Sequence, residues 1–250
     1  MTAKVLVLVL SMEKQPFAAL EAVQRRTWAA GDIPGAPVLF YSGQVKGLAY
    51  WIARCTLWSA RIAPRYRSRL LRRFGVRRWK LYEEGDRLRV AIPDVWALIN
   101  AKMVATFSHV LRTGDFDYVF RTNSSSYVDR VGLLRWVENL PRTNCYGGSV
   151  HEWEGIPVAS GSGLLLSRDL VNACVCDASW DFDVMDDLAI ARSMCRRGIV
   201  PIHHPRVDAR EPGELEPEHI QDIFHVRCKN RQDRSRDVET MLRASVLFNP

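Results

Sequence analysis

The chain has 250 residues, of which 47% are hydrophobic and 25% are charged, an ordinary globular composition that fits one domain spanning 1–250. Its 35 Lys and Arg against 28 Asp and Glu give a formal net charge of +7, so we expect an anionic partner. No apolar run reaches the roughly 20 residues that cross a bilayer, and the stretch from Val5 to Leu10 is too short for the core of a signal peptide. These limits predict a cytoplasmic protein, either soluble or peripheral at a membrane.

Hydrophobic periodicity predicts strands that alternate with helices. Strands are expected at 4–10, 37–41, 87–92, from 116 onward and at 199–203. Helices are expected at 16–28, 48–62, 95–111, from 130 to about 140, at 186–197 and at 237–247. The repeated β-α order favours an α/β fold with a doubly wound, mostly parallel sheet flanked by helices.

The strand that begins at Phe116 runs directly into a cluster of short polar side chains, Asn123, Ser124 and Ser125. The carboxyl edge of such a sheet is where α/β proteins bind ligands, and Ser11 follows the first strand in the same way. Amide and hydroxyl groups there can hydrogen-bond a ribose or sugar hydroxyl without a cation. A serine-rich turn that binds nothing is the alternative.

Two further motifs have both a structural and a functional interpretation. Ser160, Gly161, Ser162 and Gly163 could let the backbone pass close to a bound sugar, because glycine lacks a side chain, or could form a plain turn. His203 and His204 resemble a metal pair, but adjacent strand residues point to opposite faces. We therefore expect one inward and one outward histidine.

Five separated pieces occur in a recognisable order. They are Arg25-Arg26-Thr27-Trp28, the block from Asp94 to Lys102, Ser160 to Gly163 followed by Leu166-Ser167-Arg168-Asp169, Asp186-Asp187-Leu188, and Phe224-His225. This set resembles the β-1,3-galactosyltransferase and fringe group of inverting glycosyltransferases, which have the GT-A fold. The resemblance implies a nucleotide-sugar-binding half at about 1–129 and an acceptor-binding, catalytic half at about 130–250.

The same resemblance implies transfer of a sugar from a nucleoside diphosphate donor to a hydroxyl of a glycan or lipid-linked acceptor. Asn123, Ser124 and Ser125 stand where those enzymes carry an acidic triplet. Because hard divalent cations prefer anionic oxygen ligands, we assign no metal and no other cofactor.

A metal-independent transfer needs cations that stabilise the departing diphosphate. The candidates are Lys102, Arg121, Arg25 and His225, with Asp94 as a further donor-site residue on the motif. Arg25 could instead pair on a helix surface, and Arg121 could brace its strand.

The acceptor hydroxyl must also lose a proton to a nearby carboxylate. The family position assigns Asp186 as the base and Asp187 as an orienting partner or helix cap. The structural alternative is that both residues only cap the helix.

The segment from Arg61 to Lys80 carries many arginines and no acid, interleaved with aromatic residues. We interpret it as part of an amphipathic, basic helical insertion near 47–80. It could bind an anionic membrane surface or, alternatively, nucleic acid, or it could be a solvated face.

The sequence therefore predicts a glycosyltransferase of surface polysaccharide or glycolipid assembly. One alternative keeps this chemistry but acts on modified bases of DNA. The other is a non-catalytic protein of the same fold that binds nucleotide sugar, glycan or membrane.

Overall fold

The computed structural model describes residues 3–44, 81–230 and 232–248. The predicted helix at 48–62 and the basic segment from Arg61 to Lys80 lie outside these residues. None of the helices in the described part is both long and apolar enough to cross a membrane.

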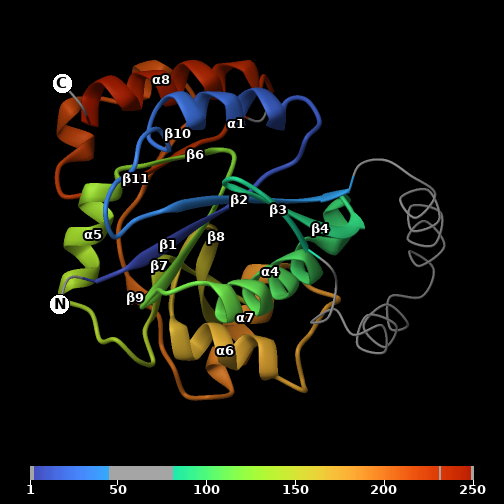
Figure 1. Cartoon of the computed structure of the whole chain (residues 1–250). Helices are drawn as coiled ribbons and strands as arrows, with labels where there is room; N and C mark the ends of the chain where they lie inside the picture. The colour runs from blue at the N-terminus through green and yellow to red at the C-terminus, as the bar shows by residue number, and fades with distance from the viewer. Residues whose placement is uncertain (1–2, 45–80, 231, 249–250) are drawn as a thin grey trace.

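Strands and helices alternate through the first half of the chain, and strands dominate the middle (Figure 1). The elements are β1 (Val5–Leu10), α1 (Phe17–Arg26), β2 (Val38–Gln44), β3 (Leu81–Glu84), β4 (Arg87–Pro93), η2 (Trp96–Leu98), α4 (Ile99–Thr113), β5 (Tyr118–Asn123), β6 (Ser126–Val128), α5 (Arg130–Glu138), β7 (Tyr146–Trp153), β8 (Ile156–Ser167), α6 (Arg168–Cys176), α7 (Asp186–Cys195), β9 (Ile202–His203), β10 (Val207–Ala209), η3 (Pro212–Glu214), η4 (Pro217–Ile220), β11 (His225–Cys228) and α8 (Ser235–Phe248).

The main sheet has the order β3-β4-β2-β1-β5-β8-β7-β9. Its strands from β4 to β5 are parallel, which confirms the α/β prediction for the first half. Strand β8 is antiparallel to both β5 and β7, and β3 is antiparallel to β4. Strand β9 is again parallel to β7, so the sheet is mixed, with four of its seven pairings among the described residues parallel. The predicted α/β class is confirmed, and the antiparallel pairings around β8 were not predicted.

The antiparallel pairing of β7 with β8 arises from a hairpin that was not predicted from the sequence. Glu154 and Gly155 join β7 to β8 with φ angles of 51° and 76°. A two-residue turn with both residues in the left-handed region matches the twist of a hairpin, and glycine adopts that region easily. The turn sends the chain back beside itself, so no crossover helix is needed.

Each face of the main sheet carries its own hydrophobic core. In β1, Val5, Val7 and Val9 belong to the core on one face, while Leu8 belongs to the core on the other. Side chains of a strand alternate between faces, so a strand buried on both sides becomes a continuous apolar run. Figure 1 shows α4, α6 and α7 on one face and α1 and α8 on the opposite side of the molecule.

A small second sheet, ordered β10-β11-β6, contributes to the core on the α8 side. It brings the segment after β11 next to the end of β5, because Cys228 donates its backbone N–H to the Ser125 carbonyl at 2.7 Å. This contact draws C-terminal residues to the carboxyl edge of the main sheet.

Strand register gathers the polar side chains at that edge. Leu10 of β1 pairs with Asn123 of β5, and Thr122 pairs with Gly163 of antiparallel β8. The Thr122 hydroxyl also donates to the Ser162 carbonyl at 2.5 Å. Residues after β1, residues after β5 and the middle of β8 therefore meet in one place.

Candidate functional site

A cavity of about 670 Å³ opens at the carboxyl edge of β1 and β5. It is lined by Leu10, Ser11, Met12, Pro16, Phe17, Trp96, Ile99, Lys102, Arg121, Asn123, Ser124, Ser125, Ser160, Gly161, Ser162, Met185, Asp186, Asp187, Arg227, Lys229, Asn230 and Arg234. We call it the edge cavity. Its volume is within the range of small-molecule sites, and its position is the one expected for ligands of α/β sheets.

The edge cavity brings together most of the predicted site residues from distant parts of the chain. These are Ser11, Lys102, Arg121, Asn123, Ser124, Ser125, Ser160, Gly161, Ser162, Asp186 and Asp187. Four predicted residues do not line it, namely Arg25, Asp94, Gly163 and His225.

A buried ion pair between Arg121 and Asp186 lies in the wall of the cavity. The Arg121 Nη2 group donates to Asp186 Oδ2, and the two side chains are 3% and 4% exposed. Burial raises the pKa of Asp186 against the opposing effect of Arg121. Burial disfavours the charged form of Arg121, but Asp186 and Tyr41 outweigh it and raise the pKa of the guanidinium, so Arg121 stays charged.

Asp187 holds two backbone segments together. Its Oδ2 accepts the N–H of Gly161 at 2.9 Å, and its Oδ1 accepts the N–H of Leu188 at 2.9 Å. This role fits the prediction that Asp187 orients the site. The suggestion that both aspartates only cap α7 is wrong, because Asp186 pairs with Arg121 and Asp187 also binds β8.

Lys102 reaches the cavity from the first turns of α4, but a carboxylate already compensates its charge. The ammonium group donates to Asp94 Oδ1, and the two side chains are 1% and 0% exposed. A buried ion pair is stable only when both charges are matched. Asp94 therefore holds Lys102 in place from outside the cavity, and it does not itself line the donor site as the motif implied.

The polar cluster after β5 forms a hydrogen-bonded turn in the lining of the cavity. Asn123 Oδ1 accepts the N–H of Ser125 at 3.0 Å, and the N–H of Ser124 donates to the Leu10 carbonyl at 3.1 Å. The turn alternative for this cluster is thus correct as local structure, although all three side chains also line the cavity.

The two glycines of the Ser-Gly-Ser-Gly motif face protein side chains within strand β8. A Cβ at Gly161 would lie 2.7 Å from Arg121 Nη1, and a Cβ at Gly163 would lie 2.2 Å from the His225 ring. The motif is therefore not a plain turn. Glycine is required at 163 because His225 packs there, not because a ligand passes.

His225 is 2% exposed, and its Nε2 has no hydrogen-bond partner among the described residues. Burial, reinforced by the nearby arginines 206 and 227, holds the pKa of His225 well below its ordinary range. A neutral, enclosed imidazole cannot supply positive charge to a ligand. The assignment of His225 as a cation of the donor site was wrong.

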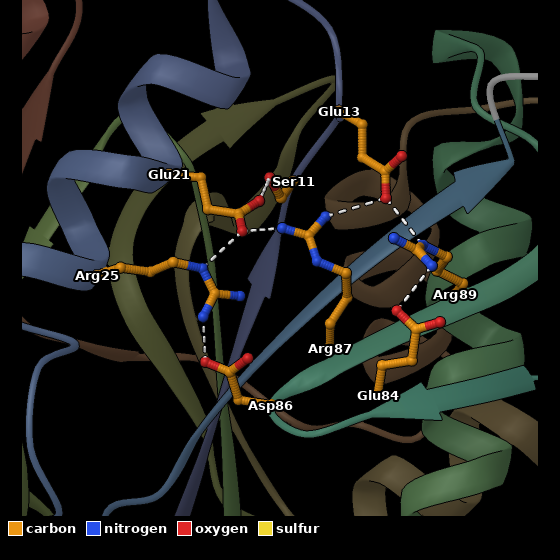
Figure 2. Close-up of polar contacts among 8 residues, drawn as sticks. All are labelled: Ser11, Glu13, Glu21, Arg25, Glu84, Asp86, Arg87 and Arg89. Atoms are coloured by element: carbon orange, nitrogen blue, oxygen red, sulfur yellow. Dashed lines mark hydrogen bonds and ion pairs between the residues drawn. The ribbon is translucent and has the colours of Figure 1, made fainter.

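Arg25 belongs to a chain of ion pairs beside the first strands, drawn in Figure 2. It pairs with Glu21 at 2.8 Å and with Asp86, and its guanidinium lies 4.1 Å from the centre of the Phe40 ring. The structural alternative is therefore correct for Arg25. Glu21 also accepts the hydroxyl of Ser11, so this network fixes one side chain of the edge cavity.

Residues around β11 were missed by the sequence analysis. Arg227, Lys229, Asn230 and Arg234 all line the edge cavity. Arg206 does not line the cavity but donates to Ser162 Oγ, which belongs to a lining residue, at 2.5 Å. Their spacing showed no motif, and the one signal in the sequence was the concentration of basic residues from 227 to 236.

His203 and His204 have different environments, as predicted. His203 is exposed, whereas His204 packs against Trp136, with ring centres 4.7 Å apart. In the described ranges, no three His, Cys, Asp or Glu side chains form a group that could hold a metal ion.

A smaller cavity of about 250 Å³ adjoins the edge cavity. Trp96, Ile99, Met185 and Asp186 line both. Trp153, at the end of β7, lines the smaller cavity but not the edge cavity. Its side chain is 54% exposed, and that of Trp96 is 67% exposed. Asp186 thus lies where a cavity lined by several cations meets a smaller one flanked by two exposed indole rings.

No protein-family model matches this chain, and a search of curated proteins finds no match. The class of site is therefore defined by its own residues: a sheet-edge cavity with a buried acid at the boundary between two compartments.

Proposed function

We propose that this protein is a glycosyltransferase with a GT-A-like fold, transferring a sugar from a nucleoside diphosphate donor to a hydroxyl of a glycan or lipid-linked acceptor. The observation that carries the proposal is the position of Asp186, which lines both the edge cavity and the smaller cavity. One compartment is large enough for the donor and is lined by several cations, and the other offers indole faces to an acceptor.

In this mechanism Asp186 is the general base. Its carboxylate, held by Arg121 through Oδ2, accepts the proton of the acceptor hydroxyl. The hydroxyl oxygen then attacks the anomeric carbon from the face opposite the diphosphate, the bond to the diphosphate oxygen breaks, and the configuration inverts. A carboxylate with a raised pKa is a stronger base than an ordinary aspartate, which favours proton removal near neutral pH.

Asp187 and Arg121 position the base. Asp187 ties the start of α7 to Gly161 of β8, and Arg121 ties Asp186 to the end of β5. Both contacts anchor the carboxylate to regular elements, which favours a fixed geometry for reaction.

The proposed transfer uses no metal. The residues at the end of β5 offer neutral oxygens, and Asn123 Oδ1 is already used by Ser125. Neutral donors are poor ligands for hard divalent cations. We place the activity in surface polysaccharide or glycolipid assembly, by the resemblance described above.

A donor screen in EDTA tests the proposal. The protein is incubated with a panel of nucleotide sugars and acceptors, and released nucleoside diphosphate is measured. Wild-type protein should turn over at least one donor, and Asp186→Asn should lose about 10²-fold or more, the size of a general-base contribution. Asp115→Asn is the control, since Asp115 is 85% exposed and lines neither cavity.

Two outcomes would contradict parts of the proposal. Turnover that persists in Asp186→Asn would remove Asp186 as the base. Donor binding without turnover, across the whole panel, would favour the non-catalytic binding protein instead.

A further inference from the structure

The edge cavity has more positive than negative charge in its lining. Its ionisable residues comprise the cations Lys102, Arg121, Arg227, Lys229 and Arg234 and the acids Asp186 and Asp187. Lys102 is additionally compensated by Asp94, and Arg121 by Asp186. Arg234 is likewise paired with Asp237, so among the arginines of the lining the weakly compensated charge is that of Arg227.

Arg227 is less compensated than Lys102, Arg121 or Arg234. The nearest acid is Asp208, with 3.9 Å between Arg227 Nη1 and Asp208 Oδ2, and Asp208 is already bound by Arg206 at 2.5 Å. Arg227 Nε is buried and has no hydrogen-bond partner among the described residues. Burial and repulsion from arginines 206 and 234 lower the pKa of Arg227. A buried donor without an acceptor is costly unless a ligand supplies one.

Arg234 holds its guanidinium over the polar turn after β5. Its Nη2 donates to Ser125 Oγ at 2.7 Å, and its Nε lies 2.9 Å from Asp237 Oδ2. Asp237 itself is fully buried and anchors α8. These two contacts orient the Arg234 guanidinium, and its Nη1 takes part in neither of them.

We propose that Arg227 and Arg234, with Lys229 beside them, form a phosphate-binding subsite that takes the diphosphate of the donor. The identity of the donor rests on the proposed function, but the recognition of two linked phosphates does not. Guanidinium groups bind phosphate oxygens through paired N–H donors, which suits an anion with several adjacent oxygens.

This subsite corrects the expected source of positive charge. Of the cations predicted from the sequence, Arg25 and His225 do not line the cavity, and Lys102 and Arg121 are each bound to a carboxylate. Negative charge that develops on a leaving diphosphate would meet Arg227 and Arg234, which line the same cavity as Ser124 and Ser125.

Inorganic pyrophosphate is the probe, titrated calorimetrically into the full chain in EDTA at two salt concentrations. Arg227→Ala is the main variant. Arg234 is left intact, because its loss would remove the counter-charge of buried Asp237. Arg112→Ala is the control, since Arg112 is exposed at the far end of α4 and bonds Ser108.

We expect Arg227→Ala to weaken pyrophosphate binding at least tenfold, and Arg112→Ala to leave it unchanged. Arg227→Lys keeps the charge but loses the fork of donors, so its affinity should fall between the two while its salt dependence remains close to that of wild type. If circular dichroism shows that the alanine variant folds poorly, the subsite can still be tested with this conservative variant.

The subsite is overturned if folded wild-type protein does not bind pyrophosphate, or if folded Arg227→Ala and Arg227→Lys both bind it with wild-type affinity. The glycosyltransferase proposal fails separately. Pyrophosphate binding that depends on Arg227, without turnover of any nucleotide sugar, would keep the subsite and reject the enzyme. Turnover of a nucleotide sugar, with unchanged pyrophosphate affinity in the Arg227 variants, would keep the enzyme and reject the subsite.

Discussion

The Arg121–Asp186 pair allows the structural and chemical roles of Asp186 to be separated. We predict the behaviour of Asp186→Asn, Arg121→Met and the double variant. Both side chains are almost fully buried, so each single change leaves one charge in the interior without its partner. Removal of one member of a buried ion pair costs about 3–5 kcal/mol.

The losses in unfolding free energy caused by the two single substitutions should not be additive. Replacing both members removes both charges, and such replacements are often close to neutral when the new side chains pack well. Arg121→Met also removes the donor to the Tyr41 hydroxyl, a contact of 3.3 Å that contributes about 1 kcal/mol. We therefore expect the double variant to lose at least about 2 kcal/mol less than the sum of the singles.

Urea unfolding at pH 7, monitored by tryptophan fluorescence, measures these free energies. Each single loss is large beside a total stability of about 5–15 kcal/mol, so the midpoints should separate clearly. If Asp186 is also the base, the double variant regains stability but stays without turnover. Single losses below about 1 kcal/mol, or additive losses, would refute this account of a mutually dependent buried pair.

Three further outcomes follow from the geometry. Gly163→Ala should destabilise the fold by about 1–3 kcal/mol in urea, because its Cβ would lie 2.2 Å from the His225 ring, whereas Gly213→Ala, with no atom within 4 Å, should be close to neutral. The folded chain resists protonation of His225, whose pKa is well below the ordinary value, so stability should fall as the pH drops below about 6.5, by at most about 1.4 kcal/mol per pH unit from this group. His225→Gln should flatten that part of the pH profile, and an unchanged slope would contradict the assignment. Trp153→Ala should raise the KM for the acceptor and leave the KM for the donor unchanged, because Trp153 lines only the smaller cavity; equal changes in both would argue against separate compartments.

Elements with strong local patterns could be predicted from the sequence. The run from Val5 to Leu10 is apolar throughout because both faces of β1 are covered, and helix 95–111 appears as η2 followed by α4. The edge cluster from Asn123 to Ser125 could also be predicted, since the end of a buried strand determines its location. These features depend on neighbours within a few residues.

The antiparallel pairings of β8 could not be predicted in the same way. Its hairpin depends on Glu154 in a left-handed conformation, which is uncommon for glutamate, followed by Gly155. The short strands β6, β10 and β11 have three or four residues each, too few for a period to be recognised. They form because they cover one another and α8, which is a property of the whole fold.

The charge of the site also depends on contacts between residues that are far apart in the sequence. Lys102 and Arg25 occupy the expected motif positions, yet each is paired with a carboxylate, and the partner of Arg25 at Asp86 is 61 residues away. Sequence position shows which cations can reach the sheet edge, but not which of them are already neutralised. On the β11 side Arg234 is also paired, with Asp237, whereas Arg227 is 24% exposed and weakly compensated. A ligand with several negative charges is therefore expected to bind there, with its uncharged part toward Asp186 and the indole rings of the smaller cavity.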